Sequence, residues 1–250
     1  MRRFRLILIL LVSVTFGKTE VFPGSFTINH ASLSRLRFPL ALGPMGKFSF
    51  MLWVNGAFAD VGDQYFGGVN VNFGRIGAVG TFAPYRTGTG TAWEYSSTIP
   101  AISTGIWKVV CMTFDTGAPA TQKMKFYTGT STSSIVSVAA TAVTEGSGLY
   151  SADGENLATL GTNADPANKS VGGEYGFIMI STGILTLQDF QDQQFTPHVT
   201  TSTLLLAMVS TFNSTGTVRD LSGNGNTGSM ADMTFSANGP PIYTPDGVGW

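Results

Sequence analysis

The sequence predicts an all-β protein, a two-sheet antiparallel β-sandwich, and three observations support this prediction. Glycine accounts for 31 of the 250 residues, against about 7% in average proteins, and such chains suit many short strands joined by tight turns. Charged residues make up 12% of the chain and apolar residues 43%, so there is ample material for a core. Several short segments also alternate apolar and polar residues, with the period of two that a half-buried strand requires.

The clearest alternation lies in residues 48–55. Its even-numbered residues are expected to face the core, so Trp53 points to the opposite face, where parity does not reveal what covers it. A second strand is expected over 107–115, forming a hairpin with 123–128 across a polar turn. In the strand over 48–55 the even-numbered apolar residues are Phe48, Phe50, Leu52 and Val54. Further strands are expected over 69–73, 76–82 (with a break at Gly74 and Arg75), 135–143, 157–161, 175–180 and 204–212.

Residues 186–193 form the best helix candidate in the chain. Thr186 can accept a hydrogen bond from the amide of Asp189, and Asp189 is favoured near a helix N-terminus by the helix dipole. One short helix near 186–193 is therefore expected beside the sheets.

The start of the chain resembles a secretory signal. Arginines occupy positions 2, 3 and 5, residues 6–16 form a mostly apolar run, and Gly17 is small. The run is shorter than the roughly 20 residues that a membrane span needs. We therefore expect residues 1–17 to be a signal peptide and 18–250 to be one extracellular domain with no membrane span; an uncleaved anchor or a buried strand is the alternative. The triplets at Asn168 and Asn213 fit the N-glycosylation pattern, which matters only in a eukaryotic source.

The charge balance excludes one class of partner. Beyond residue 17 the chain holds 11 basic and 15 acidic residues, which is no basic footprint for nucleic acid. A β-rich surface with so little charge is open to edge pairing, so a homo-oligomer is plausible. Cys111 is the single cysteine, so no disulfide can form within the chain, and its apolar surroundings predict a small buried side chain.

Three motifs in order carry a resemblance to a known family. Residues 107–115, Trp-Lys-Val-Val-Cys-Met-Thr-Phe-Asp, resemble without gaps the Trp-His-His-Val-Ala-Val-Thr-Tyr-Asp strand of laminin-G-like domains. Residues 48–54 look like the Phe-Thr-Ile-Ser-Ala-Trp-Val strand of that family, and residues 125–129 look like its Leu-Tyr-Val-Asp-Gly turn. The chain thus resembles the concanavalin A-like lectin/glucanase superfamily, and within it the laminin-G-like domains, which implies a jelly-roll arrangement of the sandwich.

A fourth motif is degenerate. Residues 173–181 occupy the place of the Gly-x-Ile-Asp-Glu-Val-Arg-Ile-Tyr segment of the family. Gly176 stands where an aspartate is common, and Ser181 stands where a tyrosine is common. Residues 185–190 then fit the short helix that ends the motif. The resemblance covers roughly residues 25–235.

One segment departs from the order of the family. Residues 220–228 look like the Asp-x-Ser-Gly-Asn-Gly-Asn-x-Gly segment that usually opens such a domain, yet here they come last. We interpret the chain as permuted, with a C-terminal strand segment near 204–235 closing the sandwich. The alternative is the first strand pair of a truncated second copy, which would be too short to make its own core.

No catalytic residue is predicted. Retaining glycosidases need two facing carboxylates about 5 Å apart, and the glucanase pattern Glu-x-Asp-x-x-Glu is absent. Asp153 and Glu155 have a suitable spacing but lie in a glycine-rich turn. No Gly-x-Ser-x-Gly elbow occurs, and Cys111 as a nucleophile would need exposure and a histidine partner. The sequence therefore predicts a protein that is not an enzyme.

Calcium is the candidate cofactor. It takes oxygen ligands from carboxylates, amides and carbonyls, and Asp220, Asn224 and Asn226 place three such groups in one glycine-rich turn. Relatives of this fold often hold calcium. In the other interpretation these side chains serve the turn itself, through local hydrogen bonds to the backbone.

Sugar binding is predicted at an aromatic cluster near a glycine- and threonine-rich stretch. Trp93 and Tyr95 flank Glu94, and Tyr85 and Tyr65 lie near expected loops. An exposed ring beside an acid could stack on a pyranose while the acid accepts hydrogen bonds from hydroxyls. The alternative is that Trp93 and Tyr95 pack on a strand.

Three function classes follow. The first is a secreted, non-catalytic recognition module that binds carbohydrate or an extracellular protein. The second is a structural or assembly protein of a surface, fibre or virion, which the low charge also favours. The third, a secreted glycoside-active enzyme, lacks a catalytic pattern. The fold alone does not decide among them.

Overall fold

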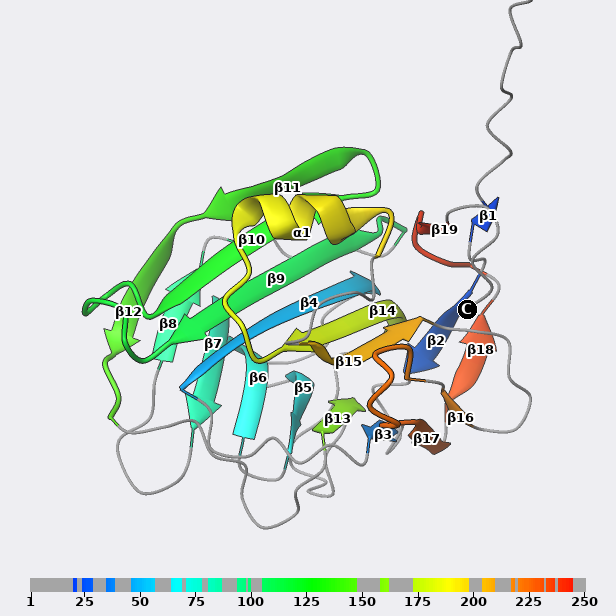
Figure 1. The fold of residues 1–250 in the computed structure, drawn as a ribbon, viewed down its shortest axis with the longest axis horizontal. Helices are drawn as coiled ribbons and strands as arrows, with labels where there is room; N and C mark the ends of the chain where they lie inside the picture. Colours follow the sequence, from blue (N-terminus) through cyan, green and yellow to red (C-terminus); the bar gives the residue numbers. More distant parts are fainter. Residues whose placement is uncertain are drawn as a thin grey trace, which may run out of the picture.

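In the computed structural model the chain folds into two antiparallel sheets packed face to face (Figure 1). Every strand pairing in the described part of the chain is antiparallel. The fold is the all-β, two-sheet jelly-roll sandwich that the sequence predicted. The structure describes residues 20–21, 24–28, 35–38, 46–56, 64–68, 71–77, 81–86, 94–97, 99, 105–147, 158–161, 173–197, 204–209, 217–218, 220–231, 233–236 and 238–244.

The larger sheet has eight strands. In spatial order it runs β11 (Ser133–Val138), β10 (Met124–Thr130), β9 (Lys108–Asp115), β4 (Lys47–Asn55), β14 (Gly173–Ser181), β2 (Ser25–Ile28) and β18 (Thr234–Ser236), with β15 (Leu204–Val209) beside β14. The centre of the sheet is formed by β9, β4 and β14. β15 pairs with β14 beyond the end of β2, so both strands use the same edge of β14.

The smaller sheet has seven strands and lies across the core from the larger one. Two short ribbons complete the fold. The seven-stranded sheet runs β16 (Thr217–Val218), β17 (Gly228–Ala231), β3 (Arg35–Phe38), β13 (Ala158–Gly161), β5 (Gln64–Gly68), β6 (Val71–Gly77) and β7 (Thr81–Arg86). The ribbons are β12 (Ala140–Thr144) with β8 (Glu94–Ser97), and β1 (Glu20–Val21) with β19 (Tyr243–Thr244).

Two predicted strand boundaries are wrong, one because a strand continues through an expected break and one because the chain changes its partner strand. Gly74 and Arg75 do not break a strand, because β6 runs through them with a register irregularity against β7. The single strand expected over 135–143 is two strands, since β11 pairs with β10 while β12 leaves to pair with β8. The apolar run is continuous across this transfer, so alternation alone could not locate it.

The core between the sheets is aromatic. The even-numbered residues of β4 lie in it, as predicted, together with Val110, Met112 and Phe114 of β9. From the smaller sheet come Leu36, Phe38 and Val218. Burying a large apolar side chain completely contributes about 1.5–3 kcal/mol, so this layer supplies much of the stabilisation of the sandwich.

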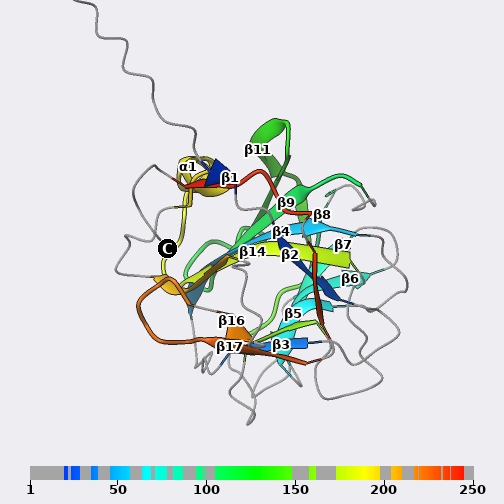
Figure 2. The ribbon, with the colours of Figure 1, turned by 90° about the vertical axis from the view of Figure 1, so that its right-hand side faces the viewer.

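A second apolar layer covers the outer face of the larger sheet, and it is this layer that buries Trp53. The Trp53 side chain is fully buried there, together with Val109, Cys111 and Phe177. Phe190 of helix α1 (Leu187–Gln194) and Ile242 of the C-terminal segment lie over these residues. The central strands are therefore apolar on both faces because both faces are covered, and Figure 2 shows α1 on the side of the larger sheet away from β3 and β17.

Helix α1 begins as predicted. The Thr186 side chain accepts from the Asp189 amide at 3.2 Å, and Asp189 Oδ2 accepts from the Thr186 amide at 2.7 Å, which forms a capping box. No helix in the described part of the chain is long and apolar enough to cross a membrane.

The strands near residues 204–235 join both sheets. β15 pairs with β14 and β18 with β2 in the larger sheet, and β17 pairs with β3 in the smaller one. The segment that departs from the family order thus lies between strands of the same sandwich. Residues 1–17, the predicted signal, lie outside the described residues.

Candidate functional site

The predicted sugar-binding residues do not all lie in loops. Glu94 belongs to β8, Tyr85 to β7 and Tyr65 to β5, so each is part of a strand. Trp93 lies outside the described residues, as do Asn168 and Asn213.

Tyr95 is not an exposed platform, because its side chain is fully buried in the core between the sheets. Its hydroxyl donates to Glu145 Oε1. Burial, and then the hydrogen bond to Glu145 and its charge, raise the pKa of Tyr95 far above the usual value. A buried ring has no free face for a sugar, so the packing alternative is correct for Tyr95. Tyr95 is buried because successive side chains of a strand point to opposite faces, and in β8 its side chain is on the face toward the core.

The same carboxylate organises an unusual turn. Glu145 Oε1 also accepts from the Thr121 amide at 2.7 Å. Thr121 has φ of 64°, the left-handed region, which is unfavourable for a β-branched residue and occurs where surrounding contacts enforce it. Tyr95 and Glu145 therefore hold the loop between β9 and β10 in a strained shape.

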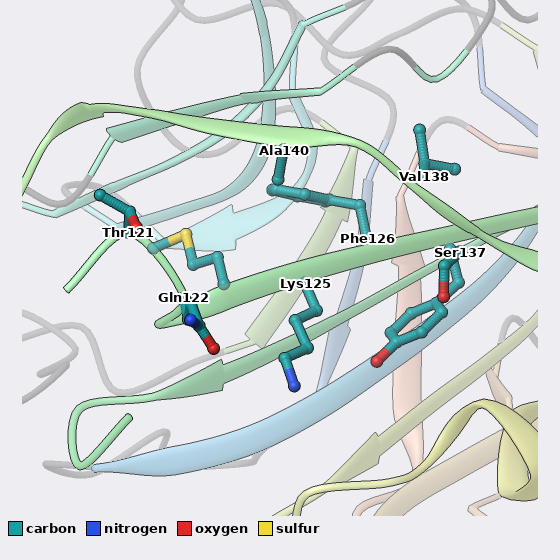
Figure 3. Close-up of a pocket in the computed structure, with 9 residues that line it drawn as sticks. Thr121, Gln122, Lys125, Phe126, Ser137, Val138 and Ala140 are labelled. Atoms are coloured by element: carbon teal, nitrogen blue, oxygen red, sulfur yellow. The ribbon is translucent and has the colours of Figure 1, made fainter. Parts of the chain in front are cut away.

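Two adjoining pockets flank β10 beside this loop, and we call them together the β10 groove. The loop-side pocket, about 280 Å³, lies between the β9–β10 loop and residues 184–187. The fork pocket, about 220 Å³, lies where β11 and β12 diverge from β10. Gln122, Lys125 and Tyr127 line both pockets. In Figure 3 the Lys125 side chain lies between Gln122 and Ser137. Ligand pockets usually measure about 300–1,000 Å³, so a ligand of ordinary size would use both.

The loop wall of the groove is internally braced. Asp115 Oδ1 accepts from the Gly117 amide at 2.8 Å, and Asp115 Oδ2 forms a 3.1 Å ion pair with Lys47. Lys123 Nζ donates to the carbonyls of Thr116 and Ala118 at 2.8 and 3.0 Å. The loop thus has its shape before any ligand arrives, which lowers the entropic cost of binding.

The opposite wall is braced by a buried serine. Ser49 Oγ donates to the Gly183 carbonyl at 2.7 Å and accepts from the Leu185 amide at 2.8 Å. The two bonds fix residues 183–185 against β4. The capping box at Thr186 then continues this wall into α1.

The lining of the groove is chemically mixed. Lys125 is exposed and offers an ammonium group, Gln122 offers an amide that can both donate and accept, and Ser137 offers a hydroxyl. Burial raises the pKa of Tyr127 above the usual value, although a hydrogen bond with Thr113 opposes the shift. The Tyr127 phenol therefore stays protonated at neutral pH, and its ring packs on Phe190 with centroids 5.2 Å apart. Such a lining suits hydrogen bonding to a hydroxyl-rich ligand.

The described lining of the two pockets holds a single carboxylate. Asp115 is the one acidic residue among those that line the two pockets, whereas canonical glycosidases use a pair of carboxylates. The Cys111 thiol is fully buried, and burial raises its pKa well above the usual value, so it is no nucleophile.

The predicted calcium ligands form a hydrogen-bonded turn. Asp220 is buried, and its carboxylate accepts from the Ser222 amide, the Ser222 hydroxyl and the Asn226 amide at 2.9, 2.7 and 2.9 Å. Asn224 Nδ2 donates to Ser222 Oγ at 3.1 Å. These are the local side-chain bonds that the alternative interpretation of this segment expects. No group of three or more His, Cys, Asp or Glu gathers within the described ranges.

Calcium binding at this turn predicts a measurable effect of chelation. A bound ion stabilises the folded state by mass action, so EDTA would lower the thermal midpoint, and the Asp220→Asn variant would no longer respond to it. An unchanged midpoint in the parent protein would assign Asp220, Asn224 and Asn226 to the turn alone.

Tyr95→Phe is expected to lower the free energy of unfolding by about 1–2 kcal/mol, because it removes the hydrogen bond that the buried Tyr95 hydroxyl donates to the Glu145 carboxylate. Tyr95 also makes stability pH-dependent. Its folded-state pKa is raised, so its contribution is complete below the unfolded pKa near 10 and is lost as pH rises above that value. Urea midpoints between pH 7 and 11 should therefore fall less steeply for Tyr95→Phe than for the parent protein. Equal slopes would contradict the role given to Tyr95.

No protein-family model and no curated protein sequence matches this chain. Among solved structures, a crystal structure from Bacteroides ovatus described as that of a "putative carbohydrate binding protein" has a TM-score of 0.61 and 12% identity, and covers 89% of this chain. This chain spans 62% of that protein. Domain 4 of AbnA, a GH43 extracellular arabinanase from Geobacillus stearothermophilus, in complex with arabinotriose, has a TM-score of 0.40 and 16% identity over 71% of this chain and 90% of that domain. At these identities the first likeness shows the fold, a β-sandwich.

Sequence reasoning missed the residues that line the groove. Gln122 lies in the polar turn that was expected, and Lys125 opens the motif that resembles the family turn. Neither is aromatic or clustered in sequence with another polar group. The search for sugar-binding residues began from aromatic pairs near loops, so it passed over a groove that combines β10 with residues from the loop before it, from β11 and from residues 184–187.

Proposed function

We propose that this protein is a secreted, non-catalytic carbohydrate-binding module that holds its ligand in the β10 groove. The observation that carries this proposal is the groove itself, where the Gln122 amide of the braced β9–β10 loop lies beside the Lys125 ammonium group and the protonated Tyr127 phenol of β10. Carbohydrates present many hydroxyls that both donate and accept, and these three side chains supply complementary donors and acceptors.

Three further observations support the proposal. The solved structure from Bacteroides ovatus carries a carbohydrate-binding description on a similar fold. The three ordered motifs over residues 48–54, 107–115 and 125–129 resemble those of laminin-G-like domains within the concanavalin A-like superfamily. The apolar run over residues 6–16 supports secretion, which places the groove outside the cell, where glycans are displayed.

A glycan-array screen of the protein without residues 1–17 tests the proposal, followed by calorimetry on the strongest ligand. Gln122→Ala and Lys125→Ala should each weaken binding about tenfold, since one lost hydrogen bond to a ligand is worth about 1–1.5 kcal/mol. Both side chains lie at the surface of the groove, so the thermal midpoint should stay unchanged.

Gln188→Ala is the matched control. Gln188 is an exposed glutamine on α1 that hydrogen-bonds Asp192, and it does not line either pocket. If a glycan binds but neither groove variant weakens it, the groove is the wrong site. If no glycan binds at all, the proposed function is wrong.

A further inference from the structure

Strand β11 forms one edge of the eight-stranded sheet. It pairs with β10 on one side, and on its other side no strand of the described chain lies beside it. The strand reads Ser-Ser-Ile-Val-Ser-Val, a β-branched, uncharged segment without proline or glycine. Six-residue segments of this kind are the ones that pair most readily with another chain.

Natural sheets normally protect such an edge with lysine, proline or inward charges. Here the sequence holds no charged residue and no proline from Phe126 to Thr144. Val136 lies near the middle of the strand with 55% of its surface exposed. Among the described residues the other exposed large apolar side chains are Ile106 at 50% and Ile184 at 38%. The edge thus carries no charged residue or proline that would prevent pairing, and its middle is apolar.

Helix α1 covers only one half of this edge. The Ile135 amide donates to Gln194 Oε1 at 2.9 Å, and the Ile135 carbonyl accepts from Gln191 Nε2 at 2.7 Å. Opposite this part of β11, the pairing of β10 with β11 has a register irregularity between Thr128 and Thr130. Because the backbone groups of Ile135 already have side-chain partners, any added strand must pair with β11 beyond it, over residues 136–138.

We propose that residues 136–138 of β11 pair antiparallel with the same residues of a second copy of this chain. A segment without charge is complementary to itself, whereas a charged partner strand would lose hydration at this edge and gain no counter-ion. Antiparallel pairing of one strand with its own copy also satisfies a two-fold axis, the commonest symmetry of oligomers. With Ser137 on the axis, Val136 of each copy lies opposite Val138 of the other.

The dimer is expected to be weak. Stable protein interfaces bury about 1,200–2,000 Å², and so short a strand contact buries less than that. Sedimentation velocity on the full chain should therefore show a monomer that converts to a dimer as concentration rises. Ser137 and Val138 also line the fork pocket, so sedimentation is done without glycan, where its outcome does not depend on the proposed function.

Val136→Lys tests the edge directly. An added lysine on an exposed edge position blocks strand pairing and leaves the monomer fold intact, so the dimerisation constant should weaken at least tenfold. Ile106→Lys is the matched control, because Ile106 is similarly exposed but lies before β9, and it should leave dimerisation unchanged. A monomer at every concentration, or equal weakening by both variants, would overturn the proposal.

Ser137→Cys gives a second readout that does not depend on the strength of association. Residues directly opposite in an antiparallel pair have Cα atoms about 4.5 or 5.5 Å apart, which a disulfide can span. The variant should form a covalent dimer on mild oxidation, while the parent protein should not, since Cys111 is fully buried. No covalent dimer from Ser137→Cys, when sedimentation shows dimers, would place the interface elsewhere.

Discussion

Gln194→Glu is expected to lower the free energy of unfolding by about 3–5 kcal/mol at neutral pH, the usual cost of an unpaired buried charge. Gln194 closes helix α1 and is 1% exposed. Its Nε2 donates to the carbonyls of Thr130 and Ser133 at 3.0 and 2.8 Å, and its Oε1 accepts from Ile135. The substitution keeps the shape of the side chain but removes both donors and places a carboxylate against two carbonyl oxygens.

The defect should depend on pH in a defined direction. Burial and the facing carbonyls raise the folded-state pKa of the introduced carboxyl above its unfolded value near 4.3. The protonated form is therefore tolerated better, and the variant loses stability as pH rises from the unfolded pKa through the folded one. Urea midpoints at pH 4 and pH 8 should show a smaller difference from the parent protein at pH 4.

Two comparisons make this result specific to the buried amide. Gln188→Glu on the exposed side of the same helix should change the free energy of unfolding by less than about 0.5 kcal/mol. Gln194→Ala should cost about 3 kcal/mol without the pH dependence, because it leaves the same backbone groups unpaired but adds no charge. A defect in Gln194→Glu that is equal at both pH values would show that shape, not charge, sets the cost.

Gly176→Asp is expected to destabilise the protein by about 3–5 kcal/mol, although aspartate is common at this place in the motif that residues 173–181 resemble. Gly176 is buried in β14, and a Cβ there would overlap both Cδ and Cγ of Pro240. Overpacking of this kind costs about 1–3 kcal/mol, and the unpaired carboxylate adds to it. The glycine is needed because the C-terminal segment lies directly on the strand.

A double-mutant cycle checks this account. Pro240→Ala removes the two ring atoms that a Cβ at position 176 would meet, so Gly176→Ala should cost less in the Pro240→Ala background than in the parent protein. The difference between the two free energies of unfolding is the coupling between the positions. Additive effects would show that strain within β14 itself, rather than Pro240, excludes a side chain.

Around the Pro240 contact, the C-terminal segment is also held by polar bonds. Glu174 accepts from Asn55 Nδ2 at 2.8 Å and from Ser236 Oγ at 2.6 Å, and it also accepts from Asn238. Ser25 Oγ donates to the Asn238 carbonyl at 2.5 Å. These bonds join β2, β4 and β14 to the segment that follows β18. The segment is thus an integral part of the outer layer, which explains why position 176 has no room for an aspartate side chain.

The sequence by itself determined the features that depend on neighbouring residues. Alternation in residues 48–55 determined which side chains of β4 face the core, because a strand turns successive side chains to opposite faces. The pair Thr186 and Asp189 determined where α1 begins, because a capping box needs only residues three apart. The ordered motifs then determined the sandwich, since each carries its own strand pattern.

Only the tertiary structure decided what depends on residues distant in the chain. The transfer of the chain from β11 to β12 depends on the separate partners β10 and β8, and the burial of Tyr95 depends on the sheet packed over β8. The β10 groove joins Gln122, Lys125 and Thr186 from separate elements, so no local pattern marks it. Gly176 is a departure from the motif in sequence alone, and Pro240 supplies its reason, a close contact between segments far apart in the chain.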